Sequence, residues 1–198
     1  MRATDTSLKP TDDARLQSRG TTQTGVRLYN ERLLLSLIRR HGRLPKAEIA
    51  RLTEPSPQTV SVIVRQLEKD QLVTRGSSVK GKVGQPLQPF SLNPEGAFSI
   101  GLKVGRRSTD VLLMGLDGKV IRETHHTYDF PVPDNVLRLA RDGVQCVTAG
   151  LDAALRPRIA GIGIAAPFDL WKWRDELGAP AKVMEAWRSF DLKSEIEK

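Results

Sequence analysis

The residues best suited to direct chemistry form a short polar series that follows Ser56-Pro57. Serine is a favoured helix N-cap and proline suits the first helical position. Apolar residues then recur as one face of a helix, at Val60, Ile63, Val64 and Leu67. With that face turned inward, the side chains near the start of the helix that face outward are Gln58, Thr59, Ser61, Val62 and Arg65.

These residue types match the chemistry of DNA recognition. Glutamine can bridge an adenine, arginine can bind a guanine through two hydrogen bonds, and serine or threonine can hold a phosphate. Short side chains also let a helix lie close in the major groove. We therefore expect Ser56, Gln58, Thr59, Ser61 and Arg65 to contact double-stranded DNA, although an ordinary solvated helix face is the alternative.

Two shorter helical patterns precede this candidate recognition helix. Apolar residues at helical spacing predict a first helix from Tyr29 that ends at His41-Gly42, with Arg39 and Arg40 in its last turn. A second helix is predicted to begin around Pro45 and to end at Glu54-Pro55. Its inward positions are expected to be Ala47, Ala50 and Leu52.

A basic hairpin is predicted directly after the third helix. Residues 72–75 and 90–92 are typical of short strands, and the segment between them is rich in glycine. Arg75, Lys80 and Lys82 lie on this hairpin, and no acidic residue occurs between Arg75 and Pro94. Three helices followed by a basic hairpin, or wing, indicate a winged helix-turn-helix whose wing contacts phosphates. A flexible linker with incidental lysines is the alternative.

Charge and composition are consistent with this interpretation. Residues 1–99 carry 16 Lys and Arg against 9 Asp and Glu, a net charge of +7, whereas residues 100–198 carry 15 against 14, a net charge of +1. Cys146 is the only cysteine, and no zinc-ligand spacing occurs, so we expect no disulfide, metal or cofactor. No stretch of about 18 apolar residues is present. We expect a cytoplasmic protein that does not enter a membrane.

The second half of the chain is expected to fold as an α/β layer. Residues 98–104, 109–116 and 119–127 predict an antiparallel meander, and a helix is predicted from Asp134 to Leu155. A buried strand over residues 158–165 is expected to lie parallel to the first strand. Gly161, Gly163 and Pro167 at its end indicate either a ligand that approaches the backbone or close packing.

These features divide the chain into three parts. Residues 1–24 are expected to be a disordered tail, because they are polar and lack an apolar period. Residues 25–95 form the predicted DNA-binding domain, with its boundary at the turn Asn93-Pro94-Glu95-Gly96. Residues 96–198 form the second domain.

The order of blocks resembles the ROK family of repressors and sugar kinases over about residues 25–198. The carrying segments are the winged helix-turn-helix, IGLKVGRRSTDVLLMGLDGKVI, RIAGIGIAAPFDLW and EAWRSFDL. The resemblance implies an α+β chain in which the DNA-binding domain precedes an α/β actin-like, or ribonuclease H-like, N-terminal lobe. It also implies a sugar or sugar derivative as effector and a homo-oligomer.

Two departures from the family pattern argue against catalysis. Kinase members hold ATP with Asp-x-Gly-Gly-Thr, where this chain has Lys103-Val104-Gly105-Arg106-Arg107. The resemblance also places the catalytic or sugar-binding Asn-Asp pair, and a cysteine-rich zinc motif, beyond the position that matches Lys198. We therefore expect no catalytic residue and an incomplete actin-like domain, either a fragment of a longer regulator or a truncated product.

The sequence thus predicts a DNA-binding transcriptional regulator, most simply a repressor of carbohydrate-related genes. The first alternative is a sugar-kinase-like or sugar-binding protein with an appended winged domain. The second is a protein that uses the winged fold for protein contacts and has no DNA target.

Overall fold

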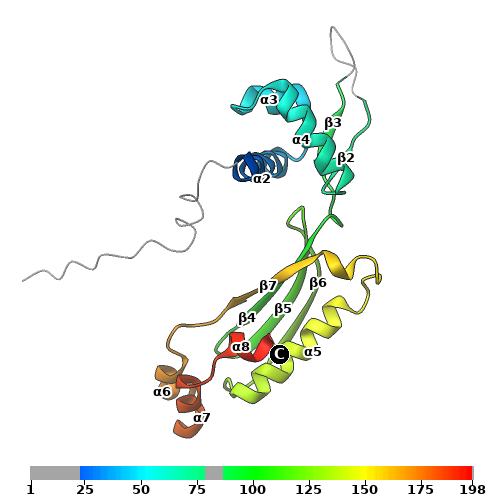
Figure 1. Cartoon of the computed structure of the whole chain (residues 1–198). Coiled ribbons are helices and arrows are strands. Elements are labelled where there is room, and N and C mark those ends of the chain that lie inside the picture. Colours follow the sequence, from blue (N-terminus) through cyan, green and yellow to red (C-terminus); the bar gives the residue numbers. More distant parts are fainter. Residues whose placement is uncertain (1–22, 79–86, 198) are drawn as a thin grey trace, which may run out of the picture.

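The computed structural model describes residues 23–78 and 87–197 as two parts joined by residues 93–97 (Figure 1). Lys80, Lys82 and nearly all of the predicted tail lie outside the described residues. The first part contains three helices and a small sheet. Its elements are α2 (Gln23–His41), β1 (Leu44–Pro45), α3 (Lys46–Leu52), α4 (Pro57–Lys69), β2 (Val73–Arg75) and β3 (Pro89–Leu92).

The winged helix-turn-helix arrangement is confirmed. Helices α2, α3 and α4 enclose an apolar core, and the three short strands form an antiparallel sheet in the order β1-β3-β2. Helix α2 ends where predicted, before Gly42, whose φ of +78° suits glycine. The core residues are Leu34, Ile38, Leu44, Ile49, Val60, Ile63, Val64, Leu67, Val73, Phe90 and Leu92.

Two local expectations for the first part were wrong, namely the start of the first helix and the inward positions of the second. Helix α2 begins at Gln23, six residues before Tyr29. Helix α3 starts at Lys46, next to the predicted start around Pro45, and Leu44-Pro45 forms a short strand paired with β3 that the sequence did not predict. The start at Lys46 places Ile49 in the core, while Ala47 and Leu52 are exposed.

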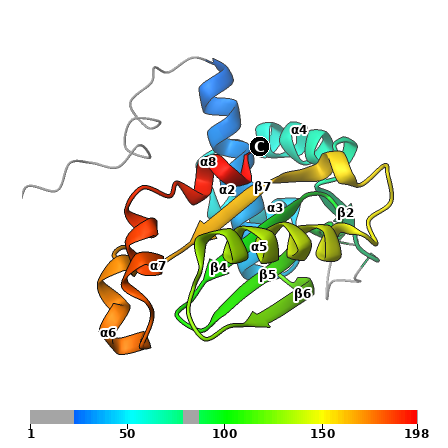
Figure 2. The same ribbon diagram turned by 90° about the horizontal axis from the view of Figure 1, so that it is seen from below.

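The second part is a four-stranded sheet covered on one face by a helix (Figure 2). Strands β4 (Phe98–Val104), β5 (Ser108–Gly115) and β6 (Val120–Thr127) form the predicted antiparallel meander. Helix α5 (Pro133–Thr148) returns the chain to β7 (Ile159–Ala165), which pairs in parallel with β4 as expected. The sheet order is β6-β5-β4-β7.

The predicted burial of β7 and the predicted length of α5 were wrong. Strand β7 is an edge strand with most of its residues exposed, because no described strand pairs with its far side. The small and apolar residues of β7 predicted a buried strand. Burial would require another element to cover this strand. Helix α5 ends at Thr148, and the chain reaches β7 through a loop and the short helix η1 (Arg156–Arg158).

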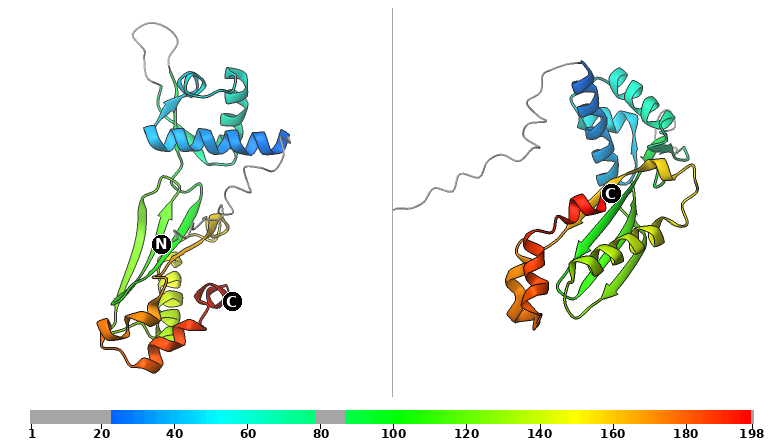
Figure 3. Two further views of the ribbon diagram at one scale, coloured as in Figure 1. Left: turned by 90° about the vertical axis from the view of Figure 1, so that its left-hand side faces the viewer. Right: turned by 60° about the horizontal axis from the view of Figure 1, so that its bottom comes forward.

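Short helices follow β7 (Figure 3). Some of these helices pack against the sheet and α5, and others form a small separate cluster with Phe130 and Trp173. The short helices are η2 (Leu170–Trp173), α6 (Arg174–Leu177), α7 (Ala181–Glu185), η3 (Ala186–Arg188) and α8 (Leu192–Ile196). Trp187 and Leu192 join the core of the lobe, and the Trp187 indole N–H donates to the Pro131 carbonyl at 2.7 Å. Across the described ranges, no helix combines the length and apolar character of a membrane span.

Candidate nucleic-acid interface

Helix α4 presents the predicted recognition face because its core face is fixed by burial. Val60, Ile63 and Val64 are at most 5% exposed, whereas Val62 is 63% exposed. Gln58, Thr59 and Arg65 are likewise exposed, and Ser61 is half-buried. The structure therefore brings five of the predicted DNA-contacting residues, including the N-cap Ser56, onto or beside one helix face.

The N-terminus of α4 is capped as the sequence predicted. The Ser56 side chain accepts a hydrogen bond from the Thr59 backbone N–H at 3.2 Å, and the two hydroxyls lie 3.0 Å apart. Pro57 occupies the first turn, where its missing N–H costs nothing. The remaining backbone N–H groups and the helix dipole make this end suitable for a phosphate group.

Helix α3 packs against the buried face of α4. The two helices are in contact, and Ile49 of α3 shares the core with the apolar face of α4. At the C-terminus of α3, the Thr53 hydroxyl donates to the Ile49 carbonyl at 2.8 Å. This packing orients the exposed face of α4 relative to the core of the domain.

Arg75 is engaged inside the domain and is not a free cation. Its guanidinium donates two hydrogen bonds to the Glu68 carboxylate, at 2.9 and 2.8 Å, and lies 5.8 Å from the centroid of the Phe90 ring. The hydrogen bond from Arg75 lowers the pKa of Glu68 below its ordinary value. To contact a phosphate, Arg75 would have to leave the Glu68 carboxylate or bind the phosphate while it remains paired with Glu68.

The base of the wing is well defined. Val73, Thr74 and Arg75 pair with Leu92, Ser91 and Phe90, respectively. The hydroxyls of Thr74 and Ser91 lie 3.2 Å apart, and the Gly76 N–H donates to the Pro89 carbonyl at 2.7 Å. The hairpin is therefore confirmed, while the phosphate contacts expected of Lys80 and Lys82 remain predictions.

The predicted ligand residues lie along the open side of β7. A Cβ atom added at Gly161 would have no described heavy atom within 4 Å, and one at Gly163 would lie 3.9 Å from the Ile100 carbonyl oxygen. Pro167 is half-buried just beyond the strand. Close packing against the described residues thus does not account for the two glycines, and their role as ligand contacts stays a prediction.

The loop that corresponds to the kinase phosphate loop is held by internal contacts. Lys103 lies 3.8 Å from Asp110, Arg106 lies over the Trp173 ring at 4.1 Å, and Arg107 donates to the Asp129 carbonyl at 2.5 Å. The Tyr128 hydroxyl lies within hydrogen-bond distance of the Gly105 and Ser108 carbonyls, at 2.9 and 2.7 Å. Burial raises the pKa of Tyr128 and keeps this hydroxyl protonated as a donor.

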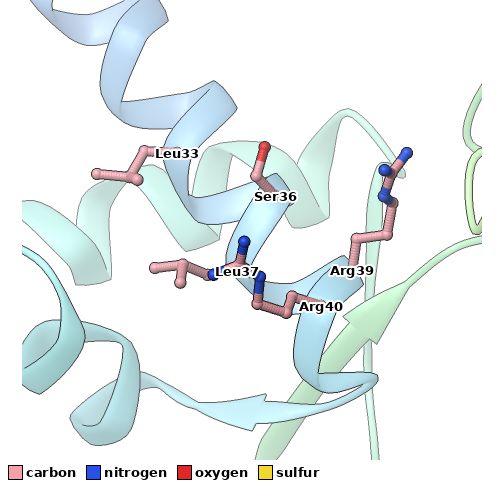
Figure 4. Close-up of a pocket in the computed structure, with 5 residues that line it drawn as sticks. All are labelled: Leu33, Ser36, Leu37, Arg39 and Arg40. Atoms are coloured by element: carbon pink, nitrogen blue, oxygen red, sulfur yellow. The ribbon is translucent and has the colours of Figure 1, made fainter.

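The structure also shows features that the sequence analysis missed. One is a shallow depression of about 430 Å³ on α2, lined by Leu33, Ser36, Leu37, Arg39 and Arg40 (Figure 4). Arg39 and Arg40 were expected only as cations in the last turn of the helix. Another is a contact between Arg158 and the end of α4, which no sequence pattern indicates because the residues are 87 or more positions apart.

Comparisons with known proteins agree with both halves of the structure. The MarR family profile matches residues 29–80. The xylose repressor of Bacillus spizizenii is 27% identical over 175 residues, which are 88% of this chain and 44% of that protein. The DNA-binding transcriptional dual regulator NagC of Escherichia coli is 25% identical over 109 residues, or 55% of this chain and 26% of that protein.

The fold also matches a solved structure. A crystal structure described as a ROK family transcriptional regulator, homologue of the E. coli MLC protein, superposes with a TM-score of 0.52 at 22% identity. The match covers 72% of this chain and 36% of that one. The chain spans less than half the length of the curated relatives it matches.

Proposed function

We propose that this chain, which belongs to the ROK family of transcriptional regulators, binds operator DNA through α4 and the wing that follows it. The observation that carries the proposal is the outward face of α4. Four buried apolar residues turn Gln58, Thr59 and Arg65 to solvent beside a capped helix N-terminus. That is the placement a helix needs to meet base edges in a major groove.

The regulation we propose is repression relieved by a sugar or a sugar derivative. The relatives named as a xylose repressor and an N-acetylglucosamine repressor support this class of effector. Gly161, Gly163 and Pro167 are the proposed ligand contacts, because the open backbone of β7 can be approached closely. We propose that the protein binds DNA as a homo-oligomer, since paired recognition helices fit successive major grooves about 34–36 Å apart.

We further propose that the chain carries out no phosphoryl transfer from ATP. The xylose repressor and NagC, which it resembles, are both named as regulators. Arg106 and Arg107 occupy loop positions where a nucleotide phosphate needs small residues, and both are bound to neighbouring groups of the lobe. These contacts support a structural role for the loop.

The test of the proposal is fluorescence anisotropy with labelled duplex DNA from the region upstream of the gene, compared with a shuffled duplex of equal composition. Measurements over a salt series separate base recognition from phosphate attraction, because only the latter is common to both duplexes. We expect tighter binding to the upstream duplex and a steep salt dependence on both. Equal, weak and salt-insensitive binding to the two duplexes would contradict the proposal.

A further inference from the structure

We infer that Arg158 is the positioning residue through which the second domain holds the end of the recognition helix. Arg158 lies half-buried in η1, just before β7. Its guanidinium donates to the Gly96 carbonyl at 3.0 Å, to the Asp70 carbonyl at 3.4 Å and to the Gln71 side-chain oxygen. Asp70 is the C-cap of α4.

The turn that receives Arg158 is a Schellman motif with an unusual residue. The Leu72 N–H donates to the Leu67 carbonyl at 2.8 Å, and the Gln71 N–H donates to the Glu68 carbonyl at 3.1 Å. This motif requires a left-handed residue after the C-cap, normally glycine. Here Gln71 has a φ of +60°, and it is the only non-glycine residue with a positive φ in the described part of the chain.

The unfavourable backbone of Gln71 suggests a role for its side chain. A glycine would close the same turn without strain, so the residue is best explained by a contact that glycine cannot make. The side-chain oxygen of Gln71 accepts a hydrogen bond from Arg158. The strain and the contact between domains therefore occur at the same residue.

Linker residues hold the same junction together. The Asn93 side-chain amide donates to the Gln71 carbonyl at 2.7 Å. Gly96 is buried so closely that a Cβ atom would lie 2.7 Å from the Gln71 carbonyl oxygen. On the other side, the Leu116 N–H donates to the Pro94 carbonyl at 3.1 Å. The end of α4, the linker and the sheet thus form one contact region.

This geometry gives a route for regulation, which rests on the proposed function. Strand β7 begins directly after Arg158 and contains the proposed ligand residues Gly161 and Gly163, and its pairing with β4 is irregular where Ala160 and Gly161 lie opposite the single residue Ser99. A shift of β7 would move the Arg158 guanidinium and, with it, the last turn of α4. The second domain would in this way control the angle at which the recognition helix meets DNA.

The first test measures amide hydrogen exchange by NMR in the whole chain without DNA. Arg158→Ala removes three hydrogen bonds at this junction and is expected to speed exchange of the Leu72 amide by at least roughly two- to tenfold, the effect of losing a single hydrogen bond. Arg156→Ala is the matched control, because the Arg156 guanidinium donates to the Leu151 carbonyl of its own domain, at 3.5 Å. Unchanged exchange at Leu72 in Arg158→Ala would overturn the inference.

The second test measures whether DNA binding to the first domain stabilises the second domain against unfolding. All three tryptophans, Trp171, Trp173 and Trp187, lie in that domain, so tryptophan emission follows its unfolding alone. In the unsubstituted chain, saturating upstream duplex should raise the tryptophan-monitored unfolding midpoint, since a ligand stabilises every part coupled to its site.

Both Arg158→Ala and Gln71→Gly should still bind the duplex but lose most of this rise, whereas Arg156→Ala should keep it. Gln71→Gly provides an independent check, because glycine suits the turn and the fold is retained. An undiminished rise in both variants would refute the coupling. Failure of the unsubstituted chain to bind any duplex would instead count against the proposed function, and the exchange experiment would still decide the role of Arg158.

Discussion

Arg65 is the residue on which base recognition depends most in this account. It is exposed in the middle of α4 on the face opposite Ile63 and Val64. Arg65→Ala should weaken binding to the preferred duplex by about 1–3 kcal/mol and relax the preference at one base pair. Anisotropy with single-base variants of the duplex measures both effects. Arg138→Ala on α5 is the control, because Arg138 is a similarly exposed helical arginine in the other domain.

Ser56 has two separable roles, as a helix cap and as a proposed phosphate contact. Ser56→Ala removes the acceptor of the Thr59 N–H and should lower the stability of the domain by about 1 kcal/mol. Ser56→Asp keeps a capping oxygen and adds a charge that favours the helix N-terminus but repels phosphate. The thermal unfolding midpoint should therefore be lower for Ser56→Ala than for Ser56→Asp and the unsubstituted chain. DNA affinity should fall for Asp, and retained affinity would exclude a phosphate near Ser56.

The pair between Glu68 and Arg75 predicts a defined pH dependence. Arg75 lowers the pKa of Glu68 below its ordinary value of 4.5, so the unfolded chain binds this proton more readily than the folded chain. The stabilisation is fully present above about pH 4.5 and is lost as the pH falls through the lowered pKa. Urea unfolding of Glu68→Gln and the unsubstituted chain should differ at pH 7 and converge at low pH. A gap that persists at low pH would contradict this assignment.

Residue patterns predicted which face of α4 is exposed, but they did not predict the partners of nearby charged residues. The spacing of Val60, Ile63, Val64 and Leu67 was sufficient to orient α4, because helical periodicity is local. No pattern of residues indicated that Arg75 is bound by Glu68 or that Arg158 reaches Gln71. Those contacts depend on how separate elements pack, and no local spacing encodes them.

At the level of elements, the wing should contribute affinity without selectivity. Lys80 and Lys82 lie between β2 and β3 in sequence and carry the wing's remaining predicted phosphate contacts. Replacing both with alanine should weaken binding to upstream and shuffled duplexes equally, and should reduce the salt slope by about 0.9 for each phosphate that is no longer neutralised. Lys172→Ala and Lys193→Ala, combined in the second domain, form a control of equal charge. Weakened binding confined to the upstream duplex would show that the wing reads bases.

The sequence predicted the elements whose residues show a clear local pattern. It did not predict the features that depend on pairing or packing with distant segments. Strands β4 and β5 show alternating burial, and the turn at Gly118, whose φ is +83°, leads from β5 into β6. Strand β1 has only two residues and exists through its pairing with Phe90 and Pro89. The exposure of β7 likewise depends on which strands flank it, and its composition alone suggested burial.

For the whole molecule, the structure joins a winged helix-turn-helix domain to an α/β lobe through a tightly packed linker. Arg158, Gly96 and Asn93 meet at the end of α4, so the two domains are joined at the helix that we propose reads DNA. The sequence predicted both domains and their order. Their contact could not be predicted, because it links residues 62 to 88 positions apart through side-chain and backbone geometry.

The most direct test of the central claim is selection of duplexes bound by the whole chain from a library of random DNA, followed by sequencing. We expect one short motif to be enriched, and the same selection with Arg65→Ala should lose the preference at a single position of that motif. Enrichment of no motif by the unsubstituted chain, or an identical motif from both proteins, would contradict the claim that the exposed face of α4 reads DNA.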